Sequence, residues 1–351
     1  MPDGDVGTSR PAASYEPGAA TVAACAGCAT QLAPSLLACP SCGTLVHAAE
    51  LTRLAAVAEE ADRRGDLPAA AAAWRDALEL LPAAAPQHAA VATRLDDVTR
   101  RIDAAPRVRP SAATTDGSWL KRGWGAISAA VVVLLSKAKL LLLGLTKAKT
   151  LFSMLAFVGV YFQLYGWPLA AGFVASIYIH EMGHVAALAR YGIRAGAPMF
   201  IPGLGAFVRL KQAPLNARED ARVGLAGPEW GLGAAAGALV VFLITGIPVW
   251  GAIAGLGAYL NLFNLLPVWQ LDGARGFRAL SRPQRWTAAG ATALAGLLAS
   301  QPLLYVVAAV GGYRAWRSRE ETADGRAFVT YLVLVVSLTA IVAATASVAR
   351  R

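Results

Sequence analysis

The chain has 351 residues and is 56% hydrophobic but only 15% charged, against about 25% charged in soluble domains, which excludes a disordered chain and indicates a membrane protein. The formal charge of +10 divides unevenly, since residues 1–122 contain 12 Lys/Arg and 14 Asp/Glu (net −2) and residues 123–351 contain 20 and 8 (net +12). The basic excess lies with the apolar runs, which is typical of spans flanked by Lys and Arg in a lipid bilayer and argues against a nucleic-acid partner.

The first 48 residues predict a tail and a small metal site. Residues 1–21 are rich in Gly, Pro, Ala and Ser and lack the features of a signal peptide, so we expect a disordered tail on the cytoplasmic side. Residues 22–48 contain all four cysteines as two CxxC pairs, Cys25 with Cys28 and Cys39 with Cys42. Four thiolates at this spacing can hold one structural Zn²⁺ in a zinc ribbon. Two disulfides are the alternative, which a reducing cytosol disfavours.

Residues 49–104 are rich in Ala and predict an α-helical hairpin that breaks at Gly65-Asp66 and is followed by a third helix. The stretch from Leu51 to Ala84 resembles one tetratricopeptide unit, in which small residues let two helices approach and Trp74 fills the groove between them. This segment binds a protein partner or serves as a spacer, and both interpretations stay open. Residues 105–122 are rich in Pro, Ser and Thr and predict a linker.

Residues 123–149 are apolar but contain Lys137 and Lys139 in the middle of the run. Because a charge at the centre of a bilayer is costly, we expect an amphipathic helix that lies at the membrane interface. If the segment spans the membrane instead, the N-terminal half lies on the opposite side.

The rest of the chain predicts about six transmembrane helices, from uncharged runs of about 20 residues or more. The runs divide into a core in residues 150–285, with two spans in 150–179 and two between Arg222 and Asp272, and two additional transmembrane helices in residues 286–351, expected at 286–313 and 327–349.

The distribution of Lys and Arg predicts the orientation in the membrane. The loops 190–222 and 275–285 are rich in these residues and fall on the side of the N-terminal half and of Arg350-Arg351, which the positive-inside rule makes cytoplasmic. The loop 314–326, with four Arg, falls on the outer side and is the exception. We expect a multi-pass protein of the plasma or inner membrane.

The first long apolar run is followed by His180-Glu181-Met182-Gly183-His184. Its two histidines have the spacing of metal ligands on a helix. Residues i and i+4 share one face of a helix, so both histidines can hold one Zn²⁺. Glu181 can then take a proton from the attacking water and pass it to the leaving nitrogen of a peptide. The alternative is a pair of helix histidines with a chance Glu, which an apolar segment disfavours because hydrocarbon penalises ionisable groups.

Two histidines leave a tetrahedral zinc one protein ligand short, and Asp272 is the candidate for the third. It ends the next pair of apolar runs, and its other interpretation is an ordinary helix N-cap. Pro267 breaks the preceding helix, so Asn264 can turn to a cavity and donate a hydrogen bond to a peptide carbonyl or oxyanion. Alternatively, Asn264 is an amide that packs between helices.

With these two motifs in place, the sequence resembles the site-2 proteases, which are intramembrane zinc metalloproteases. The resemblance rests on the HExxH sequence in a span and on the later Asn264-x-x-Pro267-x-x-x-x-Asp272-Gly273 sequence. It implies a three-helix catalytic core with His180, His184 and Asp272 as zinc ligands, Glu181 as general base and Asn264 near the scissile peptide, with the zinc towards the cytoplasm.

Residues 200–211 look like the membrane-associated hairpin loop of that family, which can pair with an unwound substrate segment. Glu229 departs from the family pattern, and we interpret it as an acid at the cytoplasmic edge or as a gate residue. No peptide-binding module lies between the two motifs, so we expect regulation to come from the N-terminal half.

We therefore expect a zinc metalloendopeptidase with one catalytic and one structural zinc, which cleaves protein substrates within or near their transmembrane helices. A membrane adaptor with purely structural zinc is a second hypothesis, but it has no need of Glu181. A transporter is a third, and the internal repeats that it would require are not apparent in the sequence.

Overall fold

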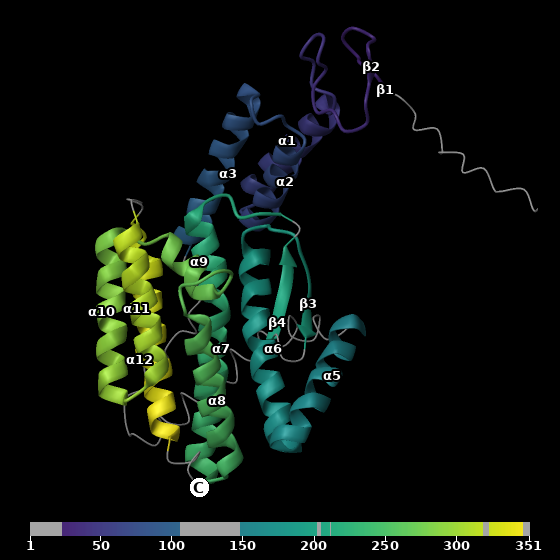
Figure 1. Ribbon diagram of the computed structural model, residues 1–351. Helices are drawn as coiled ribbons and strands as arrows, with labels where there is room; N and C mark the ends of the chain where they lie inside the picture. Colours follow the sequence, from purple (N-terminus) through teal and green to yellow (C-terminus); the bar gives the residue numbers. More distant parts are fainter. Residues whose placement is uncertain (1–22, 106–147, 202–204, 211, 319–322, 347–351) are drawn as a thin grey trace, which may run out of the picture.

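The computed structural model describes residues 23–105, 148–201, 205–210, 212–318 and 323–346. Most of these residues are helical (Figure 1). They form an N-terminal segment, which consists of a loop-rich part and three helices, and a larger helical bundle. The tail expected at 1–21, most of the linker and nearly all of the amphipathic helix expected at 123–149 lie outside the described residues.

The N-terminal segment contains two short strands, β1 (Ala23–Ala24) and β2 (Gln31–Leu32), and three helices, α1 (Ala48–Arg63), α2 (Leu67–Glu79) and α3 (Pro86–Ala104). Gly65 has a φ of 73°, which a residue with a side chain rarely adopts, and it follows the end of α1. The Asp66 carboxylate then accepts a hydrogen bond from the Ala69 N–H and caps α2. Trp74 is buried among the alanines of α1 and α2.

The described part of the bundle consists of eight further helices and one β-hairpin. They are α5 (Ala148–Tyr165), α6 (Trp167–Arg190), β3 (Ala195–Ile201), β4 (Gly205–Leu210), α7 (Ala217–Thr245), α8 (Pro248–Asn264), α9 (Asp272–Arg278), α10 (Arg282–Ala299), α11 (Pro302–Arg317) and α12 (Gly325–Thr345). Asn216 caps α7 through a hydrogen bond from the Glu219 N–H, and Gly246 ends it in the left-handed conformation. Pro248 follows directly at the start of α8, where its missing N–H costs nothing.

Helices α6, α7 and α8 lie at the centre of the bundle (Figure 1). Helices α10, α11 and α12 cover one side, and α5 lies on the other, next to β3 and β4. The two strands are antiparallel, with Met199 opposite Phe207 and Ile201 opposite Gly205. This hairpin occupies the region where the sequence predicts a membrane-associated hairpin loop.

Two helices of the described residues, α7 and α12, are long and apolar enough to cross a membrane. The prediction of about six such helices is therefore wrong by this measure. Helices α8 and α11 have 17 and 16 residues, which is short of the roughly 20 needed. Helix α6 has the length, but His180, Glu181 and His184 lower its hydropathy.

The apolar run at 286–313 contains two helices where the sequence predicts one. Ser300 has a φ of 51°, and Gln301-Pro302 reverses the chain between α10 and α11. As a result α12 begins at the end of the bundle next to α1–α3, where the Asp324 N–H donates to the Ala279 carbonyl over 3.0 Å. Arg326, in the first turn of α12, thus lies next to the N-terminal helices and donates to the Asp103 carbonyl over 2.9 Å. Helix α12 ends at the other end of the bundle (Figure 1), and Arg350-Arg351, which the sequence places on the side of the N-terminal half, lie outside the described residues.

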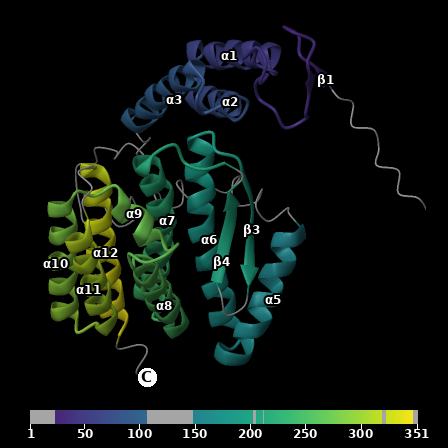
Figure 2. The same ribbon diagram turned by 45° about the horizontal axis from the view of Figure 1, so that its top comes forward.

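Helices α1–α3 lie across one end of the bundle, as both views show (Figures 1 and 2). One hydrophobic core joins the two parts, with Leu54, Trp74, Leu95 and Ile102 from the N-terminal helices and Leu188, Tyr191, Ile193 and Val223 from the bundle. The close contact depends on Gly192, because a Cβ there would lie 2.5 Å from the Pro68 oxygen and the Ala72 nitrogen of α2.

A buried ion pair lies within this contact. The Arg75 guanidinium donates to the Glu219 carboxylate over 2.7 Å and to the Tyr191 carbonyl over 3.1 Å. The side chains are 5% and 2% exposed, so neither charge has water as an alternative partner. The N-terminal helices are therefore held to the bundle by a polar contact that requires both partners.

Replacing Arg75 with Met is expected to lower the free energy of unfolding by about 3–5 kcal/mol, because it leaves the Glu219 carboxylate buried without its cation. Thermal unfolding in detergent, followed by circular dichroism, measures the change. The matched control is Arg53→Met, which removes an exposed ion pair with Glu50 and should cost at most about 1 kcal/mol. The double variant Arg75→Met/Glu219→Leu should recover most of the loss, and equal stability of the Arg75 and Arg53 variants would contradict the role of the pair.

Candidate functional site

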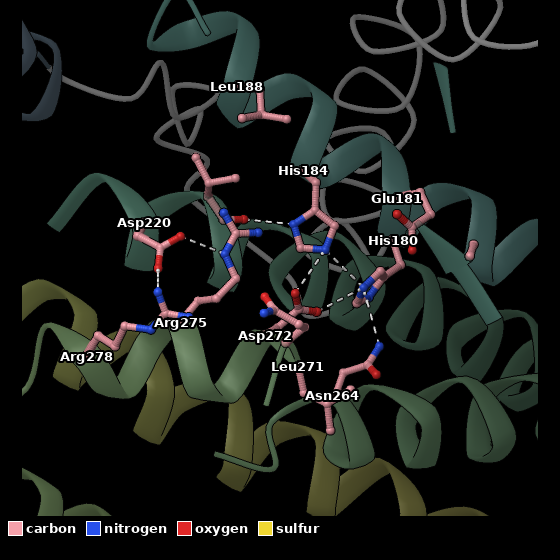
Figure 3. Close-up of a pocket in the computed structure, with 13 residues that line it drawn as sticks. His180, Glu181, His184, Leu188, Asp220, Asn264, Leu271, Asp272, Arg275 and Arg278 are labelled. Carbon is pink, nitrogen blue, oxygen red and sulfur yellow. Dashed lines mark hydrogen bonds and ion pairs between the residues drawn. The ribbon is translucent and has the colours of Figure 1, made fainter. Parts of the chain in front are cut away.

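Three side chains from two separate helices meet in the interior of the bundle. His180 and His184 lie one turn apart on α6, and Asp272 is the first residue of α9. The Asp272 carboxylate lies 3.1 Å from Nε2 of His180 and 3.3 Å from Nε2 of His184. All three side chains are buried and point toward one another (Figure 3). The structure thus brings together the three residues that the sequence predicts as zinc ligands.

Two protein oxygens determine the orientation of the imidazoles. Nδ1 of His184 lies 2.8 Å from the Val223 carbonyl oxygen, which can only accept, so this nitrogen carries the proton. Nδ1 of His180 lies 2.8 Å from Oδ1 of Asn261, whose amide nitrogen donates to the Gly257 carbonyl. Both Nε2 atoms therefore present a lone pair to the space in front of Asp272.

This set of atoms fits a divalent metal. The two Nε2 atoms lie 3.2 Å apart, and with the Asp272 carboxylate they form a cluster of electron-pair donors that lacks a cation of its own. Two imidazoles and one carboxylate are a common ligand set for catalytic zinc, which keeps its fourth position open. The donor chemistry and the proximity of the three groups therefore agree with a zinc site.

A pocket of about 320 Å³ opens beside the three ligands. Glu181 lines it and is buried, next to the histidine that precedes it. Asn264, at the end of α8, also lines it and places its amide nitrogen 3.4 Å from Nε2 of His180. The pocket therefore combines the candidate ligands, the candidate base and an amide donor, and it has room for part of a peptide.

Gly227 of α7 allows the close approach of α6 and α7 at this point. A Cβ on Gly227 would collide with the rings of both His180 and His184. A Cβ on Gly183 would likewise collide with the Ala226 carbonyl. The absence of side chains at these two positions decides where the imidazoles lie.

Sequence reasoning missed several residues around the ligands. Asn261 was not considered, although an amide one turn before Asn264 in an apolar helix is a detectable signal. The Val223 carbonyl carries no signal of its own, because any residue supplies a backbone oxygen. Asp220 and Arg275 also line the pocket, and only the packing of α7 against α9 brings them there.

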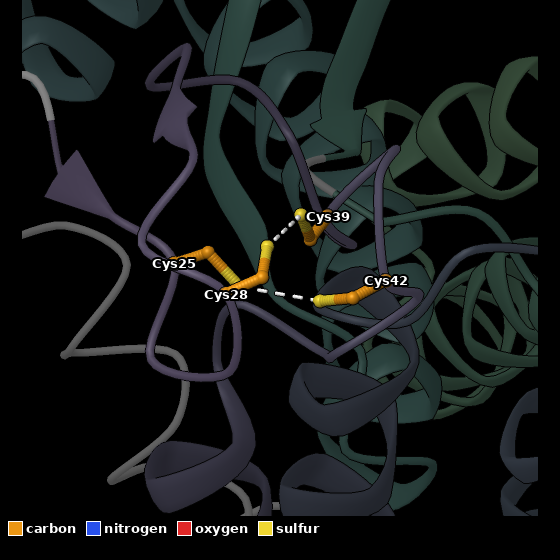
Figure 4. A group of neighbouring side chains, drawn as sticks. All are labelled: Cys25, Cys28, Cys39 and Cys42. Carbon is orange, nitrogen blue, oxygen red and sulfur yellow. Dashed lines mark hydrogen bonds between the residues drawn. The ribbon is translucent and has the colours of Figure 1, made fainter.

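The four cysteines form a second cluster, near the N-terminus (Figure 4). Their sulfur atoms lie within 4.8 Å of one another. All four cysteines of this described segment are free thiols rather than disulfides. The closest pairs join the two CxxC sequences, at 3.5 Å between Cys25 and Cys42 and 3.6 Å between Cys28 and Cys39. The side-chain and backbone hydrogen bonds of Thr44 lower the pKa of the Cys42 thiol to about 6, which favours a thiolate that can bind metal.

Glu229, which departs from the family pattern in the sequence, lies outside the zinc pocket. It lines another cavity, of about 620 Å³, between the N-terminal helices and the ends of α6 and α7. Arg190 and Arg222 line the same cavity. Glu229 therefore belongs to the junction between the two parts of the protein.

One comparison with known proteins supports the chemistry of this site. The chain is similar to a zinc metalloprotease of Methanocaldococcus jannaschii, with 28% identity over 110 residues that cover 30% of this chain and 32% of that protein. The chain thus matches about a third of the length of that relative. No family model and no solved structure matches the chain. Distant similarity to a metalloprotease and a buried His/His/Asp cluster thus point to the same class of enzyme.

Replacing Gly227 with Ala is expected to weaken zinc binding at the His/His/Asp site by about 10–100-fold, as loss of ligand orientation does elsewhere. The new methyl group would push both imidazoles away from Asp272. Competition with a zinc chelator measures the affinity. Gly233→Ala and Gly237→Ala are matched controls on the same helix, because an added Cβ has no neighbour within 4 Å at either position. Unchanged affinity in the Gly227 variant would contradict the proposed geometry.

Replacing Cys39 with Ser is expected to reduce the zinc content of the full chain from about two ions to about one, since the cluster loses one thiolate ligand. Mass spectrometry of the metal measures the content. His47→Ala is the control, because His47 lies close in the sequence but is not among the grouped ligands. A zinc content that is equal in the Cys39 variant and the wild type would argue against a structural site.

Proposed function

We propose that this protein is an intramembrane zinc metalloprotease, which hydrolyses peptide bonds within or near the transmembrane helices of other membrane proteins. The observation that carries the proposal is the buried cluster of His180, His184 and Asp272 with Glu181 beside it. A purely structural metal site has no need of a neighbouring base. The resemblance of both sequence motifs to site-2 proteases and the similarity to a zinc metalloprotease add support.

Five residues of the pocket have a role in this reaction. His180, His184 and Asp272 would hold the zinc, which would supply a Lewis acid for the peptide carbonyl and for the attacking water. The Glu181 carboxylate takes a proton from that water and delivers it to the peptide nitrogen as the C–N bond breaks. The products are a carboxylate and an amine. Asn264 is placed to donate a hydrogen bond to the peptide oxygen as negative charge develops on it.

The hairpin β3–β4 supports binding of the substrate as an extended strand. Ala206 of β4 lines the zinc pocket, so the edge of this hairpin lies next to the candidate ligands. A helix hides its carbonyls in its own hydrogen bonds, so a substrate must unwind before it can be cut. Pairing with a strand edge replaces the hydrogen bonds that the unwound segment loses.

We propose that the protein lies in the plasma or inner membrane as a multi-pass protein. Helices α7 and α12 have the length and hydropathy of spans, and the remaining bundle helices run alongside them (Figure 1). Arg190, Arg218, Arg278 and Arg326 lie at the end of the bundle next to the N-terminal helices. The positive-inside rule then supports a cytoplasmic N-terminal half and a pocket that draws water from that side. A partner protein for helices α1–α3 stays a prediction.

Glu181→Gln is expected to abolish cleavage of a tagged single-helix substrate, because the amide cannot accept the proton. The zinc content should stay that of the wild type, since Glu181 is not a ligand. Co-expression followed by immunoblotting of the fragments measures the cleavage. Glu59→Gln, at an exposed ion pair with Arg94, is the matched control and should cut normally. Equal cleavage by the Glu181 variant and the wild type would overturn the proposal.

A further inference from the structure

One arginine in the zinc pocket is not used by the mechanism. Arg275 lies one turn after Asp272 on α9, so the two side chains share a face of that short helix. Both line the pocket together with His184 and Asp220 (Figure 3). Nε of Arg275 donates to the Asp220 carboxylate over 2.8 Å, and the guanidinium of Arg278 pairs with the other oxygen of Asp220 over 3.0 Å.

One donor nitrogen of Arg275 is not used by contacts within the described part of the chain. Nη2 is buried and has no hydrogen-bond partner among the described residues, although the side chain lines the pocket and is 15% exposed. Leaving a buried charged donor unpaired is costly. The side chain is held in this position, because it packs closely on Gly224 of α7 and is tethered through Nε. Most buried polar groups find their partners within the fold. Arg275 is an exception that also lines the zinc pocket.

The charges around Arg275 select the kind of ligand. Two guanidinium groups, from Arg275 and Arg278, face the single carboxylate of Asp220. Asp220 therefore pairs with both guanidinium groups but can neutralise only one of them, and the other acids that line the pocket, Asp272 and Glu181, are assigned to the metal and to the general base. A planar guanidinium donates two parallel hydrogen bonds to a carboxylate, which is its best partner.

We infer that Arg275 is a specificity residue that binds an acidic side chain of the substrate, so that the enzyme prefers membrane helices with Asp or Glu near the cleavage site. Asp220 lies in the first turn of α7, at the end of the bundle next to helices α1–α3. The acidic residue of the substrate therefore lies on the flank that faces these helices. The inference rests on the proposed protease function, because it assigns part of the substrate to the same pocket.

The test uses synthetic single-helix peptides that are identical except for one flanking residue, which is Glu or Gln and is moved through successive positions. Binding to the full-length Glu181→Gln protein in detergent is measured by fluorescence anisotropy, so that no peptide is cut. A charged hydrogen bond predicts that the Glu peptide binds about tenfold tighter than the Gln peptide at the matching position. The preference should shrink as salt is added.

Adding Arg275→Gln is expected to bring the ratio of the two affinities to about one, because the new side chain carries no charge to pair with Glu. The affinity for the Gln peptide should change little. The matched control is Arg282→Gln, an equal change of charge at an exposed position outside the pocket, which should keep the preference. Arg275→Lys, which keeps the charge without the planar fork, should retain part of it.

Two results would overturn the inference. One is a wild-type pocket that binds the Glu and Gln peptides equally at every position. The other is an Arg275→Gln variant that keeps the preference or loses affinity equally for both peptides. Cleavage by the protein with intact Glu181 is measured in parallel and separates the two proposals. Binding that prefers Glu without any cleavage would contradict the protease function alone, and cleavage without a preference would contradict the role of Arg275 alone.

Discussion

The central constraint on this protein is that two imidazole nitrogens and one carboxylate must face one another inside an apolar bundle. Such donors repel one another unless a cation lies between them, and a buried site offers little water to relieve the repulsion. The surrounding structure holds them in place nonetheless. The Val223 carbonyl and the Asn261 amide bind the far nitrogens of the two histidines. The polar site is thus specified by the packing of four helices, α6 to α9, each of which supplies a candidate ligand or a support for one.

Close helix packing follows from that constraint. The α6–α7 contact passes through Gly183 and Gly227, and the α7–α8 contact passes through Gly231, where a Cβ would collide with Asn261. Small residues let helices approach in a membrane, where apolar side chains gain little by leaving lipid. The same closeness brings α9 against α7, so that Arg275 and Asp220 share the pocket with the candidate ligands. Substrate selection and metal binding are therefore physically adjacent in the proposed enzyme.

The N-terminal helices pack directly against the bundle and share a hydrophobic core with it. Their hydrophobic core contains Val223, whose carbonyl also orients His184. Glu219, which pairs with Arg75 of α2, lies one turn earlier on α7. A shift of the N-terminal helices would therefore be passed through Val223 to His184, a candidate metal ligand.

The sequence by itself determined what depends on local periodicity and turn chemistry. The i, i+4 spacing places His180 and His184 on one face, and the CxxC spacing gathers the cysteines. The sequence also marks the breaks that Gly and Pro impose, but the prediction of one helix at 286–313 overlooks Pro302, which follows the turn at Ser300 and begins α11. Only the tertiary structure decided the second contacts of the ligands, the position of Arg275 and the docking through Arg75. These depend on residues far apart in the chain, and a contact of that kind is set by how helices pack rather than by any sequence period.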